Sequence, residues 1–313
     1  MKLLVTRKLT DAVEKKVAAE FDATFRNGAA PMTEEEAHQA LMDYDALLVT
    51  LGDRVTAKAL SGDIRAKIVS NFGVGYNHID AAAAKARGIV VTNTPGAVTD
   101  ATADIALTLI LMSARRAGAG ERFVRSGAWT GWTPTQFLGQ HVTGKTVGII
   151  GLGRIGEAIA RRCHFGFGMP VLFHNRSPKD PGFPARQVPL EDLLAGSDFV
   201  VVAVPATPQT HHLIGAAEFA RMQPHAHFVN IARGDIVDEA ALIDALQRGV
   251  IAGAGLDVFE REPFVPEALR QLENVTMLPH LGTAALEVRD AMGFMAVDNL
   301  IAFRDGKVPP NAV

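Results

Sequence analysis

The chain contains two stretches in which short apolar runs alternate with helix-like segments. In the first stretch the apolar runs read KLLVT, ALLVT, KIVSNFG and IVVTNTP, and segments such as 33–42 and 79–87 are typical of helices. Apolar runs of this length without polar alternation are typical of strands that are covered on both faces. The pattern therefore predicts a parallel sheet flanked by helices.

The second stretch begins at GKTVGIIGLGRIG and repeats the alternation. Its further apolar runs read MPVLFHN, DFVVVAVP, AHFVNIA, IAGAGLDVF and NVTMLP. Strands that alternate with helices in this way predict a second doubly wound α/β sheet.

Two helix-like segments indicate where the chain passes between these sheets. One starts at about Thr99, just after Pro95 and Gly96, and the other covers roughly 284–303 and can return to the first sheet. We therefore predict two α/β domains, a discontinuous one comprising 1–97 plus 285–313 and a continuous one comprising 98–284.

Composition favours a cytoplasmic protein that acts on small molecules. With 31 basic and 34 acidic residues the net charge is −3, which gives no electrostatic case for nucleic acid or a membrane surface as partner. The longest apolar run, 105–114, has half of the ~20 residues that a membrane span needs, and the first residues lack a signal-peptide core. The single cysteine, Cys163, suits a reducing compartment and forms neither an internal disulfide nor a metal cluster, so we expect no metal site.

A glycine-rich turn indicates a dinucleotide-binding loop. Gly151, Gly153 and Gly156 follow an apolar strand and precede a helix. In this context the first glycine permits a tight turn, the second admits a pyrophosphate to the backbone, and the third allows close packing of helix on strand. The helix N-terminus then supplies N–H donors to the phosphates.

The segment FHNRSPKD, residues 173–180, favours NADPH as cofactor, with NADH as the weaker alternative. Asn175 lies nineteen positions after Gly156, near the place where an acidic residue would bind the ribose 2′-hydroxyl of NADH. Asn175 does not repel a 2′-phosphate, Arg176 can bind one with its guanidinium, and Ser177 adds a donor. The alternative is that Arg176 simply extends into solvent.

Three ionisable residues follow successive strands of the second sheet. They are Arg233 after HFVNIA, Glu262 after AGLDVFE and His280 after VTMLP. Ligands of open α/β sheets bind outside the carboxyl ends of the strands, so these side chains can converge in one crevice. Each also has an ordinary alternative as a packed or surface residue.

Several motifs together resemble the D-isomer-specific 2-hydroxyacid dehydrogenases. GLGRIG, NIARGDIVDEAAL, GLDVFEREP and LPHLGTAA occur in that family's order, and VSNFGVGYNHIDAAAAKARGIVVTNTPG is similar to its substrate domain. Within the family the chain looks most like glyoxylate and hydroxypyruvate reductases. The resemblance implies a Rossmann dinucleotide-binding domain and a flavodoxin-like substrate domain.

The resemblance also implies catalytic roles. Arg233 would bind the carboxylate of a 2-oxoacid and polarise its ketone, for which a bidentate and permanently charged donor is suited. His280 would donate a proton to the carbonyl oxygen as a hydride arrives from the nicotinamide. Glu262, on the other ring nitrogen, would fix the tautomer and favour the imidazolium.

Further substrate contacts are implied in the first domain and on the segment before the glycine loop. The substrate carboxylate would meet the backbone at Val74 and Gly75, although a plain tight turn uses the same glycines. Leu51 would line the pocket and limit it to short substrates. Trp132 would reach the active site of a partner subunit, which implies a homodimer, or would serve simple packing.

The predicted cofactor contacts lie on six segments. Asp257 among them would lie near the nicotinamide carboxamide, and a purely structural role is its alternative. The full set is Gly151, Leu152, Gly153, Arg154, Ile155, Gly156, Asn175, Arg176, Ser177, Val204, Pro205, Thr210, Ile231, Ala232, Asp257, His280 and Gly282.

The sequence thus predicts an NADPH-preferring reductase that converts glyoxylate to glycolate and hydroxypyruvate to D-glycerate. The alternatives are a dehydrogenase for a longer 2-oxoacid or 3-phosphoglycerate, and a dinucleotide-sensing regulator without turnover. His164 and Phe165, in RRCHFGFGMPV, receive no functional interpretation.

Overall fold

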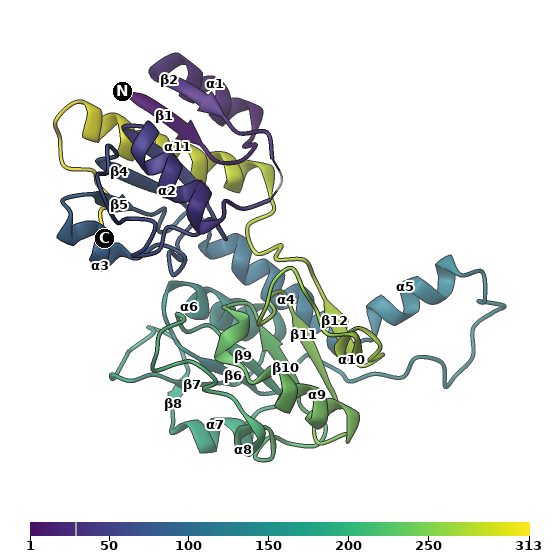
Figure 1. The fold of residues 1–313 in the computed structure, drawn as a ribbon. Coiled ribbons are helices and arrows are strands. Elements are labelled where there is room, and N and C mark those ends of the chain that lie inside the picture. The colour runs from purple at the N-terminus through teal and green to yellow at the C-terminus, as the bar shows by residue number, and fades with distance from the viewer. Residues whose placement is uncertain (29) are drawn as a thin grey trace. The chain divides into compact units, whose positions relative to one another are not determined.

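A computed structural model describes residues 1–28 and 30–313 of the chain, which divide into two compact units. Unit 1 comprises Met1–Val98 and Thr283–Val313, and unit 2 comprises Thr99–Gly282. Each unit contains its own parallel sheet with helices packed on it (Figure 1). The predicted class of two doubly wound α/β sheets is confirmed.

Unit 1 has a five-stranded sheet in the order β2-β1-β3-β4-β5, with all strands parallel. This order is that of flavodoxin-like sheets. Its strands are β1 (Lys2–Val5), β2 (Asp22–Phe25), β3 (Ala46–Thr50), β4 (Ile68–Phe72) and β5 (Val90–Thr92). Its helices are α1 (Asp11–Glu20), α2 (Glu34–Asp43), α3 (Ala81–Ala86) and α11 (Leu286–Arg304).

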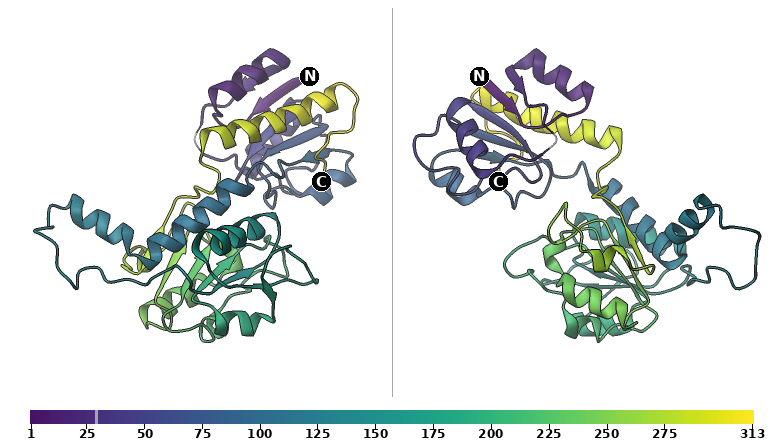
Figure 2. Two further views of the ribbon diagram at one scale, coloured as in Figure 1. Left: turned by 180° about the vertical axis from the view of Figure 1, so that it is seen from behind. Right: turned by 45° about the vertical axis from the view of Figure 1, so that its right-hand side comes forward.

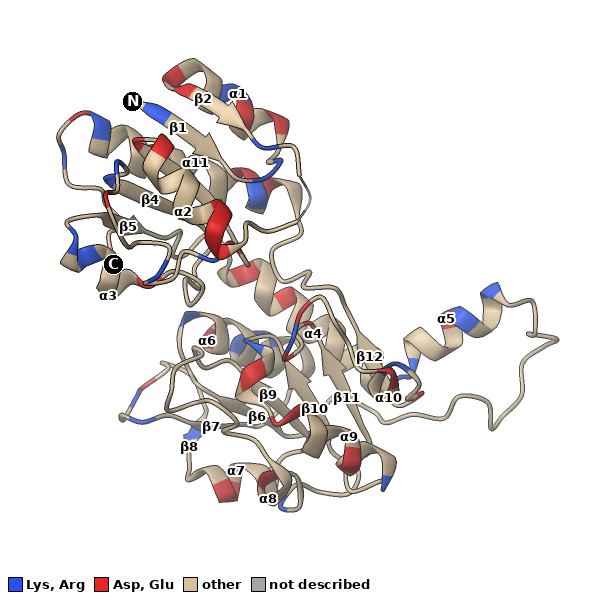
Figure 3. Ribbon diagram, in the orientation of Figure 1, with Lys and Arg blue, Asp and Glu red and all other residues tan. Residues whose placement is uncertain are grey.

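Two helices of unit 1, α2 and α3, begin at residues whose side chains cap them, Thr33 and Asp80. The Thr33 side chain accepts from the Glu36 N–H while the Glu36 carboxylate accepts from the Thr33 N–H, so two orphan donors of α2 are satisfied. The acidic first turn of α2 also complements the helix dipole. Basic and acidic residues are interspersed along the ribbons of both units (Figure 3).

Unit 2 has a seven-stranded parallel sheet in the order β12-β11-β10-β9-β6-β7-β8. The first strand, β6, thus lies between β7 and β9, which is the Rossmann arrangement with its crevice where the strand order reverses. The strands are β6 (Val147–Ile150), β7 (Val171–His174), β8 (Arg186–Gln187), β9 (Phe199–Val202), β10 (His227–Asn230), β11 (Gly253–Leu256) and β12 (Val275–Met277).

Helices cover both faces of this sheet. The α-helices are α4 (Thr99–Ala114), α5 (Ala117–Arg125), α6 (Arg154–Arg161), α7 (Leu190–Gly196), α8 (Ala216–Phe219), α9 (Glu239–Gln247) and α10 (Glu267–Arg270). A π-helix, η1 (Arg162–Gly166), continues α6, and a 3₁₀ turn, η2 (Gly234–Ile236), follows β10.

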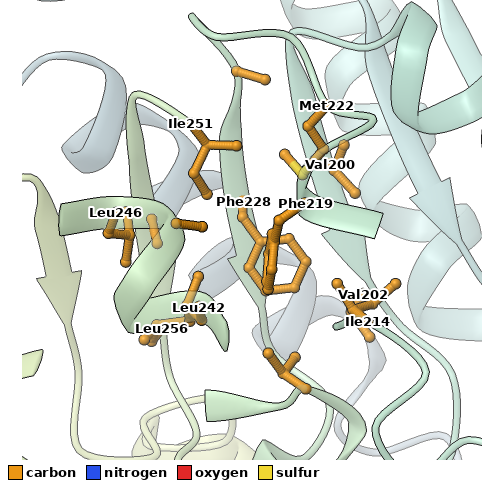
Figure 4. Close-up of a cluster of buried hydrophobic side chains, with 14 of the residues drawn as sticks. Val200, Val202, Ile214, Phe219, Met222, Phe228, Leu242, Leu246, Ile251 and Leu256 are labelled. Atoms are coloured by element: carbon orange, nitrogen blue, oxygen red, sulfur yellow. The ribbon is translucent and has the colours of Figure 1, made fainter. Parts of the chain in front are cut away.

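Alternate strand residues enter two separate cores, which is why the apolar runs show no polar alternation. Val200 and Val202 pack with helices α7, α8 and α9, where Phe219 meets Phe228 edge to face at 5.3 Å (Figure 4). Phe199 and Val201 point to the opposite core with α4 and α6. Because helices pack on both faces of the sheet, the carboxyl ends of its strands are held in fixed positions along one edge.

The elements that the sequence did not predict include two edge strands and helix α5. The short strand β2 and the two-residue strand β8 lie at sheet edges and are largely exposed, so they carry no apolar run. Helix α5 contains two glycines in AGAGERFVR. In the views of Figures 1 and 2, α5 and the segment that follows it lie away from the sheet of unit 2.

The π-helix contains His164 and Phe165, which had no interpretation. Their rings form an aromatic cluster with Phe183 at centroid distances of 4.7 to 5.8 Å, and the Arg161 guanidinium lies over the cluster. These two residues thus pack the end of α6 against the segment after β7.

Within residues 1–28 and 30–313, no helix combines the length and apolar character that a membrane span requires.

Candidate active site

The glycine loop has the geometry that a pyrophosphate requires. Gly151 has φ +96°, and a Cβ there would lie 2.6 Å from Val204 Cγ1. A Cβ on Gly156 would lie 2.0 Å from the Gly151 carbonyl oxygen, whereas a Cβ on Gly153 would meet nothing within 4 Å. Gly153 caps α6, so the space beside it faces a helix N-terminus and its free N–H groups. These residues fit a dinucleotide phosphate.

The other residues of this loop differ in exposure. Leu152 is buried and Ile155 is half-buried, while Arg154 is exposed at the first position of α6. The Leu152 N–H donates to Asn175 Oδ1 at 3.1 Å, which ties the glycine loop to the end of β7. Leu152 and Ile155 therefore hold the loop in place from the core side.

The residues after β7 leave a guanidinium without a partner. Arg176 and Ser177 are exposed, and within the described residues the Arg176 side chain makes no hydrogen bond or ion pair. By contrast, Lys179 Nζ is bound to the Leu152 carbonyl and pairs with Glu157 at 3.0 Å. Arg176 is thus the cation of this loop that remains available to a ligand.

Further predicted cofactor contacts follow β9, which lies beside β6, and β10, which lies beside β9. Thr210 Oγ1 donates to the Pro205 carbonyl at 2.8 Å and so closes the loop that starts at Val204. Ile231 is buried, and the Ala232 N–H donates to Asn230 Oδ1 at 3.0 Å. Both segments are shaped by local polar contacts at the carboxyl edge of the sheet.

The structure brings Glu262 and His280 together. Glu262 Oε2 lies 2.8 Å from His280 Nδ1, and Glu262 Oε1 accepts from the Phe259 N–H at 3.0 Å. The two side chains are 29% and 27% exposed, so Nε2 belongs to a ring that is only partly shielded from solvent. Burial of Glu262 opposes its ionisation, but the hydrogen bond with His280 and the Arg233 charge outweigh this, and the pKa of Glu262 lies below its usual value.

Arg233 directly follows the turn after β10. Burial lowers the pKa of its guanidinium, and the carboxylates of Glu262 and Asp235 oppose that change. Its Nη1 donates to the Ala232 carbonyl at 2.7 Å. The group stays charged at any physiological pH, so this half-buried cation interacts electrostatically with the carboxylate that binds His280.

Asp257 supports the loop that carries His280. Its two carboxylate oxygens accept from the N–H groups of Leu281 at 2.6 Å and Gly282 at 2.8 Å, and its carbonyl accepts from the His280 N–H at 3.0 Å. Burial raises the pKa of the Asp257 carboxyl. The hydrogen bonds from Leu281 and Gly282 and the His280 charge favour the carboxylate, but they only partly offset the effect of burial. The backbone of His280 itself is left-handed, with φ +55°.

Two residues that sequence reasoning did not select hold Arg233. Asn230 Nδ2 donates to the Arg233 carbonyl at 2.8 Å, and Asn230 is buried. A Cβ on Gly234 would lie 1.9 Å from the Phe259 carbonyl carbon, so only glycine lets the Arg233 turn approach the loop of Glu262. Their sequence signal is only their adjacency to Arg233 in NIARGD.

The remaining predicted substrate contacts lie elsewhere in the chain. In unit 1, Leu51, Val74 and Gly75 are half-buried, and within the described residues neither the Val74 nor the Gly75 N–H donates a hydrogen bond. Asn93 Nδ2 donates to the Val74 carbonyl at 2.9 Å, which orients that peptide. In unit 2, Trp132 is 80% exposed on the segment after α5.

The part of the chain that the structure describes contains no group of three or more His, Cys, Asp or Glu residues suited to a metal ion.

The family model of the D-isomer specific 2-hydroxyacid dehydrogenase NAD binding domain matches residues 107–282. Curated glyoxylate reductases of Thermococcus onnurineus and Pyrococcus horikoshii are each 44% identical over 319 aligned residues, which cover 100% of this chain and 95% of each relative. The chain belongs to the D-isomer-specific 2-hydroxyacid dehydrogenases.

Solved structures agree with this family. A protein from Thermus thermophilus is 39% identical with a TM-score of 0.93, and 100% of each chain is covered. The NADPH-dependent glyoxylate/hydroxypyruvate reductase of Sinorhizobium meliloti, solved with NADP and malonate, is 38% identical with a TM-score of 0.87, covering 100% of this chain and 96% of that one. This 2-hydroxyacid dehydrogenase is therefore an NAD(P)-dependent oxidoreductase of small 2-oxoacids.

Proposed function

We propose that this 2-hydroxyacid dehydrogenase reduces glyoxylate to glycolate and hydroxypyruvate to D-glycerate, with NADPH preferred over NADH. The observation that carries the proposal is the hydrogen bond of 2.8 Å between Glu262 and His280, with Arg233 acting on the same carboxylate. The full-length likeness to glyoxylate reductases supports the substrate class.

Arg233 binds the substrate in this proposal. Its guanidinium offers parallel N–H donors that match the carboxylate of a 2-oxoacid, and the same charge draws electron density from the adjacent ketone. Asn230 and Gly234 hold the Arg233 backbone, so the cation is oriented before substrate arrives.

His280 supplies the proton. Its Nδ1 is bound to Glu262, which leaves Nε2 to donate to the carbonyl oxygen of the substrate. The carbonyl carbon would receive a hydride from reduced nicotinamide when this cofactor is bound, so the 2-oxoacid would gain one hydride and one proton. The Glu262 carboxylate stabilises the imidazolium before transfer.

The glycine loop and the strand ends of unit 2 would hold the cofactor. Gly151, Gly153 and Gly156 accommodate the pyrophosphate, and the unpartnered Arg176 with Ser177 binds the 2′-phosphate of NADPH. Val204, Pro205, Thr210, Ile231, Ala232, Asp257 and Gly282 complete the proposed contacts. Asp257 has both carboxylate oxygens on backbone N–H groups, which supports its structural role beside the cofactor.

The contributions of the substrate domain and of a second subunit belong to the same proposal. Leu51 limits the substrate to short 2-oxoacids, and the free N–H groups at Val74 and Gly75 bind its carboxylate. The exposed Trp132 and the segment after α5 bind a second copy of the chain in a homodimer. A cytoplasmic location, indicated by the single cysteine, stays a prediction.

A steady-state comparison tests the proposal. Loss of reduced-nicotinamide absorbance is measured with glyoxylate, hydroxypyruvate, pyruvate and 3-phosphoglycerate, each with NADPH and with NADH. We expect the highest kcat/KM for the first two substrates with NADPH. Higher values for pyruvate or 3-phosphoglycerate would overturn the substrate assignment, and dinucleotide binding without turnover would indicate a regulator instead.

A further inference from the structure

One glutamine outside the predicted site spans the loop that carries Arg176. Gln187, the second residue of β8, donates from Nε2 to the carbonyls of Asn175 at 3.0 Å and Ser177 at 3.1 Å. Its Oε1 accepts from the Lys179 N–H at 3.1 Å. A primary amide has two donor hydrogens and one acceptor oxygen, so one side chain can make all three bonds at once.

The sheet places this amide where it can act on the loop. Gln187 pairs with Phe173 of β7 in register, and the Val188 N–H donates to the Phe173 carbonyl at 2.9 Å. The loop leaves the sheet at His174 and passes Gln187 again at three alternate positions, 175, 177 and 179. The Gln187 side chain therefore supplies the loop with backbone hydrogen bonds of the kind that a paired strand would make.

The ends of the same loop are bound to the glycine loop. Asn175 Oδ1 accepts from the Leu152 N–H, and Lys179 Nζ binds the Leu152 carbonyl. The exposed residues between these ends include Arg176 and Ser177. The shape of the segment between the anchors thus depends on the three bonds of Gln187.

We propose that Gln187 is a positioning residue for cofactor specificity: it shapes the backbone that presents Arg176 and Ser177 to a 2′-phosphate. The inference rests on the proposed NADPH preference. A loop fixed in its binding shape loses less conformational freedom on binding, and apparent affinity falls by the fraction of molecules that leave that shape. NADH carries no 2′-phosphate, so its binding does not need the loop in this shape.

The substitution Gln187→Ala tests the inference by steady-state kinetics with each cofactor. We expect kcat/KM with NADPH to fall roughly tenfold through KM, as the loss of two or three neutral hydrogen bonds allows. With NADH it should change less than about twofold. Gln271→Ala is the matched control, because Gln271 is an exposed glutamine that binds Glu267 on α10, and it should alter neither value.

A double-substitution cycle shows whether Gln187 acts through Arg176. If it does, Arg176→Ala with Gln187→Ala should lose no more NADPH affinity than Arg176→Ala alone. Additive losses, or equal losses for both cofactors in Gln187→Ala, would overturn the inference. If the unmodified enzyme shows no NADPH preference, the preference and the inference both fail. If the unmodified enzyme prefers NADPH and Gln187→Ala has the same kcat/KM with each cofactor, the inference alone fails.

Discussion

The closest backbone approach at the candidate site makes Gly234→Ala a direct test of its geometry. A Cβ at this position would lie 1.9 Å from the Phe259 carbonyl carbon, 2.1 Å from its oxygen and 2.2 Å from the Glu260 nitrogen. All three atoms belong to the backbone, so no side-chain rotation relieves the overlap. The φ of Gly234 is not left-handed, and the substitution therefore changes packing alone.

The size of the displacement follows from these distances. Cβ atoms in proteins essentially never approach another atom within 3.0 Å, so the two backbones must separate by at least 3.0 − 1.9 = 1.1 Å. One backbone carries Arg233, and the other leads to Glu262, whose Oε1 accepts from the Phe259 N–H. Overpacking of this kind costs about 1 to 3 kcal/mol of stability, and a displacement of about 1 Å can cost roughly 10²-fold in rate.

The assay is the rate of 2-oxoacid reduction, with dinucleotide binding followed in parallel by fluorescence. We expect kcat for Gly234→Ala to fall roughly 10²-fold and dinucleotide affinity to fall much less, because the glycine loop that would hold the pyrophosphate is separate from this contact. Gly166→Ala is the control, since Gly166 is exposed and its Cβ would meet nothing within 4 Å. A folded Gly234→Ala enzyme with unaltered kcat would refute the reasoning that close approach of these loops sets the catalytic geometry.

Other predictions concern single side chains of unit 2. His280→Ala should lower kcat by roughly 10² to 10⁴, and an unchanged kcat would remove His280 from the proposed mechanism. Burial, with a smaller contribution from His225, lowers the pKa of His227 to about 4 from 6.5, so the free energy of unfolding should fall as pH decreases through this window. That loss amounts to about 3 kcal/mol and should be absent in His227→Gln, as measured by denaturant titration at several pH values; an identical pH dependence in the variant would contradict it. Burial raises the pKa of the Cys163 thiol to about 12, so a thiol reagent should label the enzyme only after unfolding; rapid labelling of the folded chain would show that Cys163 is accessible.

Several features of the fold could be predicted from the sequence because they are local. Apolar runs without polar alternation, such as ALLVT, predict strands covered on both faces, and β3 is buried at every position. The edge strand β8 carries no such signal, since an exposed pair of polar residues needs no apolar face. The glycine spacing likewise predicted a tight turn, and Gly151 does adopt a left-handed φ.

The sequence by itself determined which residue types follow which strands, including Arg233, Glu262 and His280. Only the tertiary structure decided which of them meet, because the hydrogen bond of Glu262 with His280 joins the segments that follow two strands, β11 and β12, which pair only in the folded sheet. The supporting contacts of Gly234 and Gln187 depend on the same folding. Gly234 and Gln187 act only when a second backbone segment lies within packing or hydrogen-bonding distance, so no local sequence pattern predicts their roles.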